Sequence, residues 1–216
     1  MKKKKTLIIV VFILVAGTNK AISQEITIDP MYRIQLLVQM GKYESAIEFT
    51  EKLSDSLRCE KFEILGFSYQ NLNNHAKSIS YYEQYIEECD PSYVQRVNLG
   101  DSYYKTNQLE KAKEQFFIVK KEMPELSMVD YNLGLIAYDE GNKEKAVEYF
   151  TTAISKKKGE KLDFDYVEIQ IRTLNELGKY DTAIQNIDTI LELWDKQSIE
   201  YKYTCLLYTS PSPRDS

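Results

Sequence analysis

The chain has 216 residues, of which 43% are hydrophobic and 28% are charged, and these proportions are typical of a folded protein. Its one histidine, His75, excludes histidine-based zinc sites and most acid–base triads. The net charge of −5 disfavours binding to the phosphates of nucleic acids.

Residues 1–23 are typical of a secretory signal peptide. Lysines occupy positions 2–5, an apolar run covers residues 6–17, and Ala21 and Ser23 are small residues placed for cleavage before Gln24. We therefore expect an exported protein, either periplasmic or secreted. A permanent N-terminal membrane anchor is the alternative, although the run is shorter than the about 20 residues that span a bilayer.

Residues 205–216 have a different origin from the rest of the chain in our interpretation. The stretch CLLYTSPSPRD resembles the translation of a transposon-end adaptor used in sequencing libraries, which predicts adaptor read-through. A natural tail rich in serine and proline is the alternative. Without both ends the chain loses six of its 28 basic residues and one of its 33 acidic residues, so the net charge of residues 24–204 is about −10.

Residues 24–204 contain a pattern that recurs every 34 residues, marked by Gly66, Gly100 and Gly134. Each glycine is followed by a small residue and then by a ring: Ser78 and Tyr82, Ala112 and Phe116, Ala146 and Phe150. A glycine inside a helix costs roughly 1 kcal/mol relative to alanine, so its recurrence indicates that two helices approach closely there. We expect an antiparallel helix pair in each unit, with neighbouring pairs covering its apolar face.

Five units are expected in chain order, at residues 27–57, 59–92, 93–126, 127–160 and 164–197, and residue 198 starts another. The first and fifth match the pattern loosely, with Ala46 and Ala183 as their small residues. A glycine or asparagine follows each first helix, as suits the left-handed backbone of a helix C-terminus. These turn residues are Gly41, Asn73, Asn107, Gly141 and Gly178.

The pairs Leu65-Gly66 with Tyr69 and Leu99-Gly100 with Tyr103, followed by the small residue and the ring, resemble the tetratricopeptide repeat (TPR) family. The resemblance implies an all-α fold, a right-handed superhelical solenoid of antiparallel helix pairs over residues 24–204. It also implies non-enzymatic binding of protein partners. The family's tryptophan at the fourth position of the repeat is replaced by Phe62, Arg96 and Asp130.

In such a solenoid the first helix of each pair lines a concave groove, which family members use to hold an extended peptide or a partner helix. The family's register, projected onto this chain, predicts a stripe of amides, aromatic residues and charges of both signs. Its members are Glu63, Gln70, Asn98, Asp101, Tyr104, Lys105, Asn132, Leu135, Tyr138, Asp139, Arg172, Asn175 and Glu176.

Two alternatives remain open for this stripe. The asparagines could simply be frequent at this helical phase, and Tyr104 and Tyr138 could pack between helices instead of contacting a ligand. A clamp for the carboxylate terminus of chaperone tails is disfavoured, because Val97 and Tyr131 stand where such a clamp has cations.

Cys59 and Cys89 flank the second helix pair, one near the start of its first helix and the other after its second helix. Antiparallel helices bring these two points to the same end of the pair. A disulfide requires Cα atoms within about 7 Å of each other, and export would allow the cysteines to oxidise. Two free thiols are the alternative.

We expect no catalytic residues, no cofactor and no metal site, because the chain has no glycine-rich phosphate loop, no nucleophile elbow and no repeated Cys-x-x-Cys. We expect a protein or peptide partner, no nucleic acid, and contact with a membrane only through the N-terminal segment. The leading interpretation is an interaction scaffold of the bacterial envelope. The alternative is the extracytoplasmic sensor region of a longer signalling protein, such as a kinase or DNA-binding regulator, that continues past residue 204.

Overall fold

The computed structural model describes residues 29–157 and 164–193, and within these ranges it consists of helices and short turns. The expected signal peptide, residue 198 and the adaptor-like tail lie outside the described residues. The helices are α1 (Pro30–Gln39), α2 (Tyr43–Glu51), η1 (Asp55–Leu57), α3 (Arg58–Asn71), α4 (His75–Glu88), α5 (Tyr93–Lys105), α6 (Leu109–Glu122), α7 (Ser127–Asp139), α8 (Lys143–Lys156), α9 (Phe164–Glu176) and α10 (Tyr180–Leu193).

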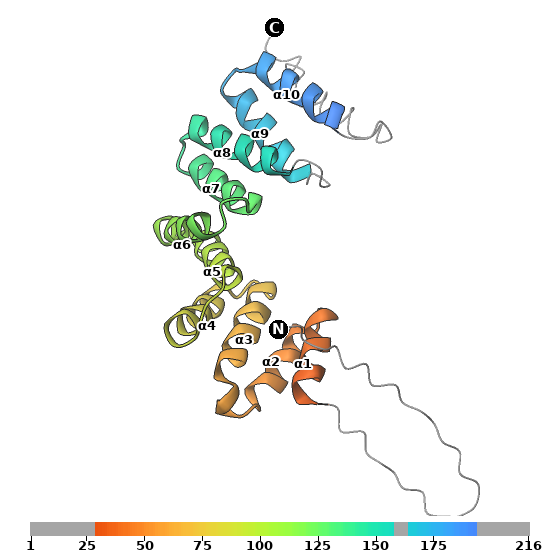
Figure 1. The fold of residues 1–216 in the computed structure, drawn as a ribbon, viewed down its shortest axis with the longest axis vertical. Helices are drawn as coiled ribbons and strands as arrows, with labels where there is room; N and C mark the ends of the chain where they lie inside the picture. Colours follow the sequence, from red (N-terminus) through yellow and green to blue (C-terminus); the bar gives the residue numbers. More distant parts are fainter. Residues whose placement is uncertain (1–28, 158–163, 194–216) are drawn as a thin grey trace, which may run out of the picture.

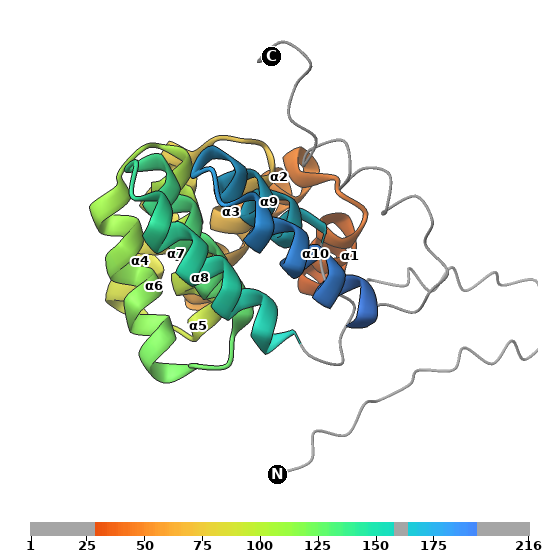
Figure 2. The same cartoon turned by 90° about the horizontal axis from the view of Figure 1, so that it is seen from above.

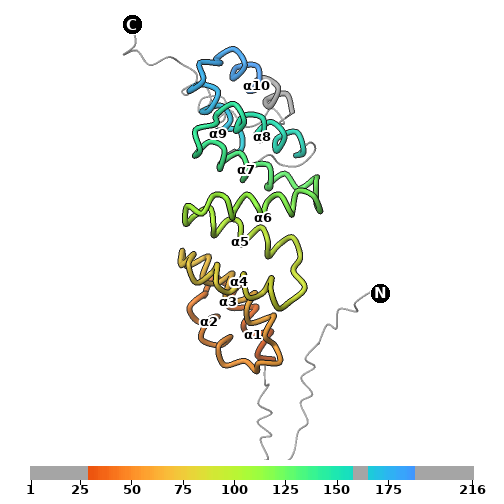
Figure 3. Tube along the Cα trace, turned by 90° about the vertical axis from the view of Figure 1, so that its left-hand side faces the viewer, coloured from red at the N-terminus to blue at the C-terminus, as the bar shows by residue number. Residues whose placement is uncertain are grey.

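The helices form five hairpins, α1–α2 to α9–α10, stacked along the long axis of the molecule (Figure 1). The tube in Figure 3 shows them as successive layers, with each second helix next to the first helix of the following hairpin. Seen along the stack, α4 and α6 lie on the opposite side from α1 and α10, so the hairpins turn as they rise (Figure 2). This arrangement confirms the expected all-α superhelical solenoid.

Local signals in the sequence set where the helices begin and end. Asn74 and Asn142 cap α4 and α8 by accepting backbone N–H groups, and Ser92 forms a capping box with Gln95 at the start of α5. The turns confirm the expected left-handed backbone, with positive φ at all five predicted positions. Their values are 69° at Gly41, 57° at Asn73, 59° at Asn107, 80° at Gly141 and 69° at Gly178.

The recurring glycines lie directly under aromatic rings of the facing helix, as the close-approach hypothesis predicts. A Cβ atom added to Gly66 would meet the Tyr82 ring at 3.0 Å, and one added to Gly100 would meet the Phe116 ring at 2.7 Å. At Gly134 the Phe150 ring is closer still. All three rings are fully buried, so glycine is needed because the ring fills the space that a methyl group would occupy.

In the first hairpin the large and the small residue of the glycine–ring pair exchange places between the two helices. Ala46 precedes Ser78 by 32 residues, and the same offset places Ile34 at the position of Gly66 and Thr50 at that of Tyr82. Ile34 and Thr50 are both fully buried. The large side chain therefore comes from the first helix in this hairpin and from the second helix in the next three, while the interface stays filled.

Neighbouring hairpins share one interior. Buried side chains of α4, α5, α6 and α7 form one hydrophobic cluster that includes Tyr82, Leu99, Phe116 and Leu133. At the α4–α5 contact the hydroxyls of Ser78 and Ser102 lie 3.0 Å apart and are fully buried. The small residue of α4 thus contributes to the stacking between hairpins.

A buried charge cluster stands where the family has its tryptophan in the fourth unit. Asp130 of α7 is fully buried, and its carboxylate pairs with Lys120 of α6 at 2.8 Å and with Lys156 of α8. The Lys156 ammonium also donates to the backbone carbonyl of Pro124. Two cations from two helices therefore hold the start of α7.

Candidate protein-binding groove

The first helices of consecutive hairpins lie beside one another, and α5 contacts both α3 and α7 directly. In the view along the stack, α3 and α9 lie near the centre and α4 and α6 at the edge (Figure 2). The predicted groove residues come from α3, α5, α7 and α9. The structure therefore brings residues that are about one repeat apart in the sequence into one continuous stripe.

Hydrogen bonds join this stripe from one hairpin to the next. Tyr104 donates its phenolic hydrogen to Oδ2 of Asp139 at 2.7 Å. Tyr138 donates in the same way to Oε1 of Glu176 at 2.7 Å. Each tyrosine lies four residues after the glycine position of its own repeat. Each acceptor lies five residues after the corresponding position of the next repeat. We call these two bonds the tyrosine ladder.

An amide takes the place of the tyrosine one hairpin earlier. Gln70 of α3 donates from Nε2 to Oδ2 of Asp101 at 2.8 Å and to the backbone carbonyl of Asn98 at 3.4 Å. It occupies the same register position as Tyr104 and Tyr138. Contacts between first helices therefore run along three successive junctions, from α3 to α9.

The electrostatics of the ladder fix which partner donates. Burial raises the pKa of Tyr104, and its hydrogen bond to Asp139 raises it further. For Tyr138 the hydrogen bond to Glu176 is the larger cause of the raised pKa. Hydrogen bonds from Lys143 and Tyr138 lower the pKa of Glu176. At neutral pH the tyrosines are thus protonated donors and Glu176 an ionised acceptor.

Other predicted groove residues contact the fold itself. Asn98 donates from Nδ2 to the hydroxyl of the buried Tyr82 at 3.0 Å. Glu63 accepts from Nε2 of Gln95 at 2.7 Å, which connects it to the capping box of α5. Arg172 donates to Glu168 one turn earlier in α9. Part of the stripe therefore stabilises the solenoid, as the packing alternative proposes.

The remaining members of the stripe differ in how exposed they are. Lys105 is exposed, with its ammonium 5.5 Å from the ring centre of Tyr104. Leu135 is half-buried against the cluster of Ala137, Ala146 and Phe150. Asn132 and Asn175 are also half-buried. These side chains keep polar or apolar surface on the stripe, which a docked chain could contact.

The hydrogen-bonded pairs of the ladder were not predicted from the sequence. The sequence contained a spacing that could have indicated them, because Tyr104 and Asp139 are 35 residues apart, which is one repeat of 34 residues plus one. Ion pairs reinforce the same junctions: Lys113 lies 2.8 Å from Glu140, and Lys143 lies 2.8 Å from Glu176. Each junction between later hairpins thus has both a ladder bond and a salt bridge.

Cys59 of α3 and Cys89, which caps α4, are joined by a disulfide with their Cα atoms 6.0 Å apart. Next to it, the guanidinium of Arg58 donates to Oε2 of Glu88 at 2.7 Å. Both contacts lie at the end of the hairpin opposite its turn, which we call its open end. The second hairpin is therefore linked covalently at its turn and again at its open end.

The described part of the chain offers neither a metal centre nor a membrane span. Residues 29–157 and 164–193 contain no group of three or more His, Cys, Asp or Glu side chains that could hold a metal ion. No helix within the same ranges is long and apolar enough to cross a membrane. The stripe itself carries hydrogen-bond donors, carboxylates and aromatic rings.

A sequence profile described as tetratricopeptide repeat matches residues 63–89 and 131–155. The TPR repeat-containing protein YpiA of Bacillus subtilis (strain 168) is 27% identical over 163 residues, which cover 72% of this chain and 37% of YpiA. The chain therefore spans little more than a third of the length of that relative.

Solved structures share the fold at lower sequence identity. A MamA fragment from Desulfovibrio magneticus RS-1 has a TM-score of 0.69 and 16% identity, over 78% of this chain and 95% of that chain. The C-terminal part of a TPR repeat-containing protein from Cytophaga hutchinsonii has a TM-score of 0.70 and 18% identity, over 83% and 68%. Residues 63–89 and 131–155 therefore match the tetratricopeptide repeat, and the solved structures show that the chain folds as a helical solenoid of this kind.

Proposed function

We propose that the chain is a non-enzymatic scaffold of the bacterial envelope that holds an extended peptide or a helix of a partner protein in its concave groove. The continuous stripe from α3 to α9 is the observation that carries this function, since its residues converge only because hairpins stack in register. Groove side chains already ordered by the ladder lose little conformational freedom on binding, and such preorganisation favours affinity.

The envelope location draws on two other features. The N-terminal segment has the pattern of a secretory signal peptide, and the Cys59–Cys89 pair is disulfide-bonded. Disulfides persist in oxidising compartments and are rare where thiols are kept reduced. The sensor alternative requires further domains beyond residue 204, a region that lies outside the described residues.

Site-specific photo-crosslinking in envelope preparations tests the groove. A photoreactive residue at Lys105, on the inner stripe, should yield a discrete adduct with a partner protein. The matched control is Lys121, an equally exposed lysine on the outer helix α6, which should not. The charge reversal Lys105→Glu should reduce the adduct formed from a photoreactive residue at Asp139. Equal crosslinking from Lys105 and Lys121 would contradict binding in the groove.

A further inference from the structure

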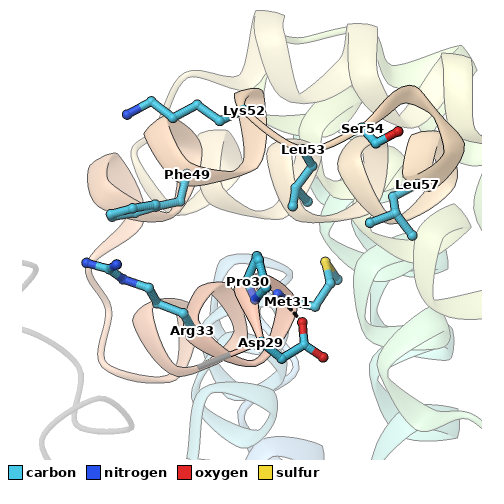
Figure 4. A pocket seen from close by; sticks show the side chains of 9 residues that line it. All are labelled: Asp29, Pro30, Met31, Arg33, Phe49, Lys52, Leu53, Ser54 and Leu57. Atoms are coloured by element: carbon cyan, nitrogen blue, oxygen red, sulfur yellow. Dashed lines mark hydrogen bonds between the residues drawn. The ribbon is translucent and has the colours of Figure 1, made fainter. Parts of the chain in front are cut away.

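A cavity of about 510 Å³ opens at the open end of the first hairpin, far along the stack from the centre of the groove (Figure 4). Its apolar lining comes from Met31 of α1, Phe49 of α2, and Leu53 and Leu57 of the following connection. The volume falls within the roughly 300–1,000 Å³ that is typical of ligand pockets. The first hairpin therefore has a concave apolar site that is distinct from the stripe.

The repeat register explains why the cavity lies in this hairpin. The offset of 32 residues places Pro30 at the position of Phe62, and Phe49 at that of Tyr81. In the second hairpin the rings of Phe62 and Tyr81 pack with centroids 6.4 Å apart. Both rings line a smaller cavity there, of about 240 Å³. Proline is too small to replace the missing ring, so the described residues leave this space in the first hairpin unfilled.

The charged groups at the rim of the cavity differ in whether a carboxylate or backbone group of the fold already pairs with them. Asp29 accepts the backbone N–H of Met31 at 2.9 Å, as the cap of α1. Lys52 is paired with Glu48 at 2.6 Å. The guanidinium of Arg33 stacks on the Phe49 ring, with its central carbon 4.0 Å from the ring centre. Within the described ranges no carboxylate pairs with Arg33, so its N–H donors remain for a ligand.

We propose that this cavity binds an acidic segment of a partner protein, with one bulky apolar side chain inside and a neighbouring carboxylate on Arg33. A stacked guanidinium presents its N–H fork edge-on, the geometry that carboxylates accept in two parallel bonds. The stripe carries Lys105 and Arg172 beside Asp101, Asp139 and Glu176, so its charges are mixed. At the cavity, the apolar lining and the N–H donors of Arg33 together make the first hairpin the docking point for an acidic segment with an apolar side chain.

Synthetic peptides test the assignment on the full chain. The probe is acetyl-Asp-Asp-Phe-Asp-Asp-amide, compared with the same peptide carrying alanine for phenylalanine and with one carrying lysines for aspartates. Binding is followed by calorimetry and by NMR shifts of the Leu53 and Leu57 methyl groups. We expect the acidic phenylalanine peptide to bind at least about tenfold more tightly than either comparison peptide.

Three variants locate the site. Arg33→Gln should weaken the acidic phenylalanine peptide at least about fivefold, whereas the exposed cation Lys42→Gln, which does not line the cavity, should change it less than about twofold. Met31→Trp, which fills the cavity, should abolish binding while thermal unfolding remains cooperative. The groove variant Lys105→Glu should leave this binding unchanged, which separates failure here from failure of the proposed groove.

Other outcomes would overturn the proposal. If the lysine peptide bound as tightly as the acidic phenylalanine peptide, or if Arg33→Gln left the affinity unchanged, the assignment of an acidic partner would be wrong. Tighter peptide binding in Ile26→Ser or Ile28→Ser would mean that the chain's own residues before α1 compete for the cavity, and would replace the partner assignment with an internal occupant.

Discussion

The first two hairpins fill equivalent positions of their interiors with different residues. In the second hairpin the Tyr82 ring lies on Gly66, and Phe62, Tyr81, a disulfide and the Arg58–Glu88 pair occupy the open end. In the first hairpin Ile34 and Thr50 exchange the sizes of that central pair, and the open end contains a cavity of about 510 Å³. The comparison teaches that these two hairpins fill their centres with opposite assignments of the large and the small residue, and that their open ends differ as well.

The central pairs should differ most clearly when the second-helix residue of each pair is replaced by alanine. Phe150→Ala should lower the free energy of unfolding by about 3–5 kcal/mol, because it empties a site where the ring is fully buried. Thr50→Ala, at the same register in the first hairpin, should cost only about 1 kcal/mol. Urea unfolding monitored by circular dichroism measures both. Similar losses would show that the two hairpins do not differ as described.

Reduction of the disulfide should affect the second hairpin alone. Opening a crosslink between residues 30 apart in the sequence should cost about 2–4 kcal/mol. Hydrogen exchange should accelerate in α3 and α4, while α7 and α8 keep their protection, since repeats contact mainly their neighbours. The variant with Cys59→Ser and Cys89→Ser is the control, and it should match the reduced protein. Uniform acceleration along the chain would argue against locally independent hairpins.

Adding a methyl group at each repeat glycine should lower the free energy of unfolding by an amount that differs from one glycine to the next. Gly134→Ala should cost about 1–3 kcal/mol by overpacking against Phe150, despite the better helix propensity of alanine. The cost should fall from Gly134 to Gly100 to Gly66, as the distance from the added Cβ to the ring increases. Gly134→Ala combined with Phe150→Leu should recover part of the loss in urea unfolding. An absent or reversed order would show that ring contact does not determine the cost.

The smallest effect is expected at the ladder, where pH gives the clearest measurement. Glu176→Gln should cost about 0.2–1 kcal/mol at neutral pH, because the pair with Lys143 is partly exposed. The folded state lowers the pKa of Glu176, so its stabilisation is present above the unfolded pKa of about 4.3 and is lost as pH falls through the folded pKa. The difference in melting temperature between wild type and variant should therefore shrink below about pH 4. A difference that persists at low pH would exclude the ionised carboxylate as its source.

The hairpins and their turns could be predicted from the sequence because their signals are local and recur. A glycine every 34 residues, a ring at fixed spacing and an Asn or Gly at each turn all depend on backbone constraints that identical units share. The size exchange in the first hairpin was not predicted, because two residues are missing at that junction. The offset of 32 residues from Ala46 to Ser78 aligns Ile34 with Gly66, but only the structure shows that Ile34 and Thr50 are both buried there.

For the site, the sequence predicted which helices carry the groove residues, but not how their side chains pair. The register placed Tyr104 and Asp139 on one stripe, yet their hydrogen bond depends on the distance between α5 and α7, which the packing of other residues sets. The buried pairing of Asp130 with Lys120 and Lys156 depends likewise on three helices meeting. The substitution at Asp130 was visible in the sequence, but its two lysine partners were not.

The position of the disulfide has a mechanical consequence. Both cysteines belong to one hairpin, so the crosslink resists separation of α3 from α4 and leaves the angle between neighbouring hairpins unconstrained. Separating α3 from α4 at their open end therefore requires a covalent bond to break, whereas tilting one hairpin against the next does not.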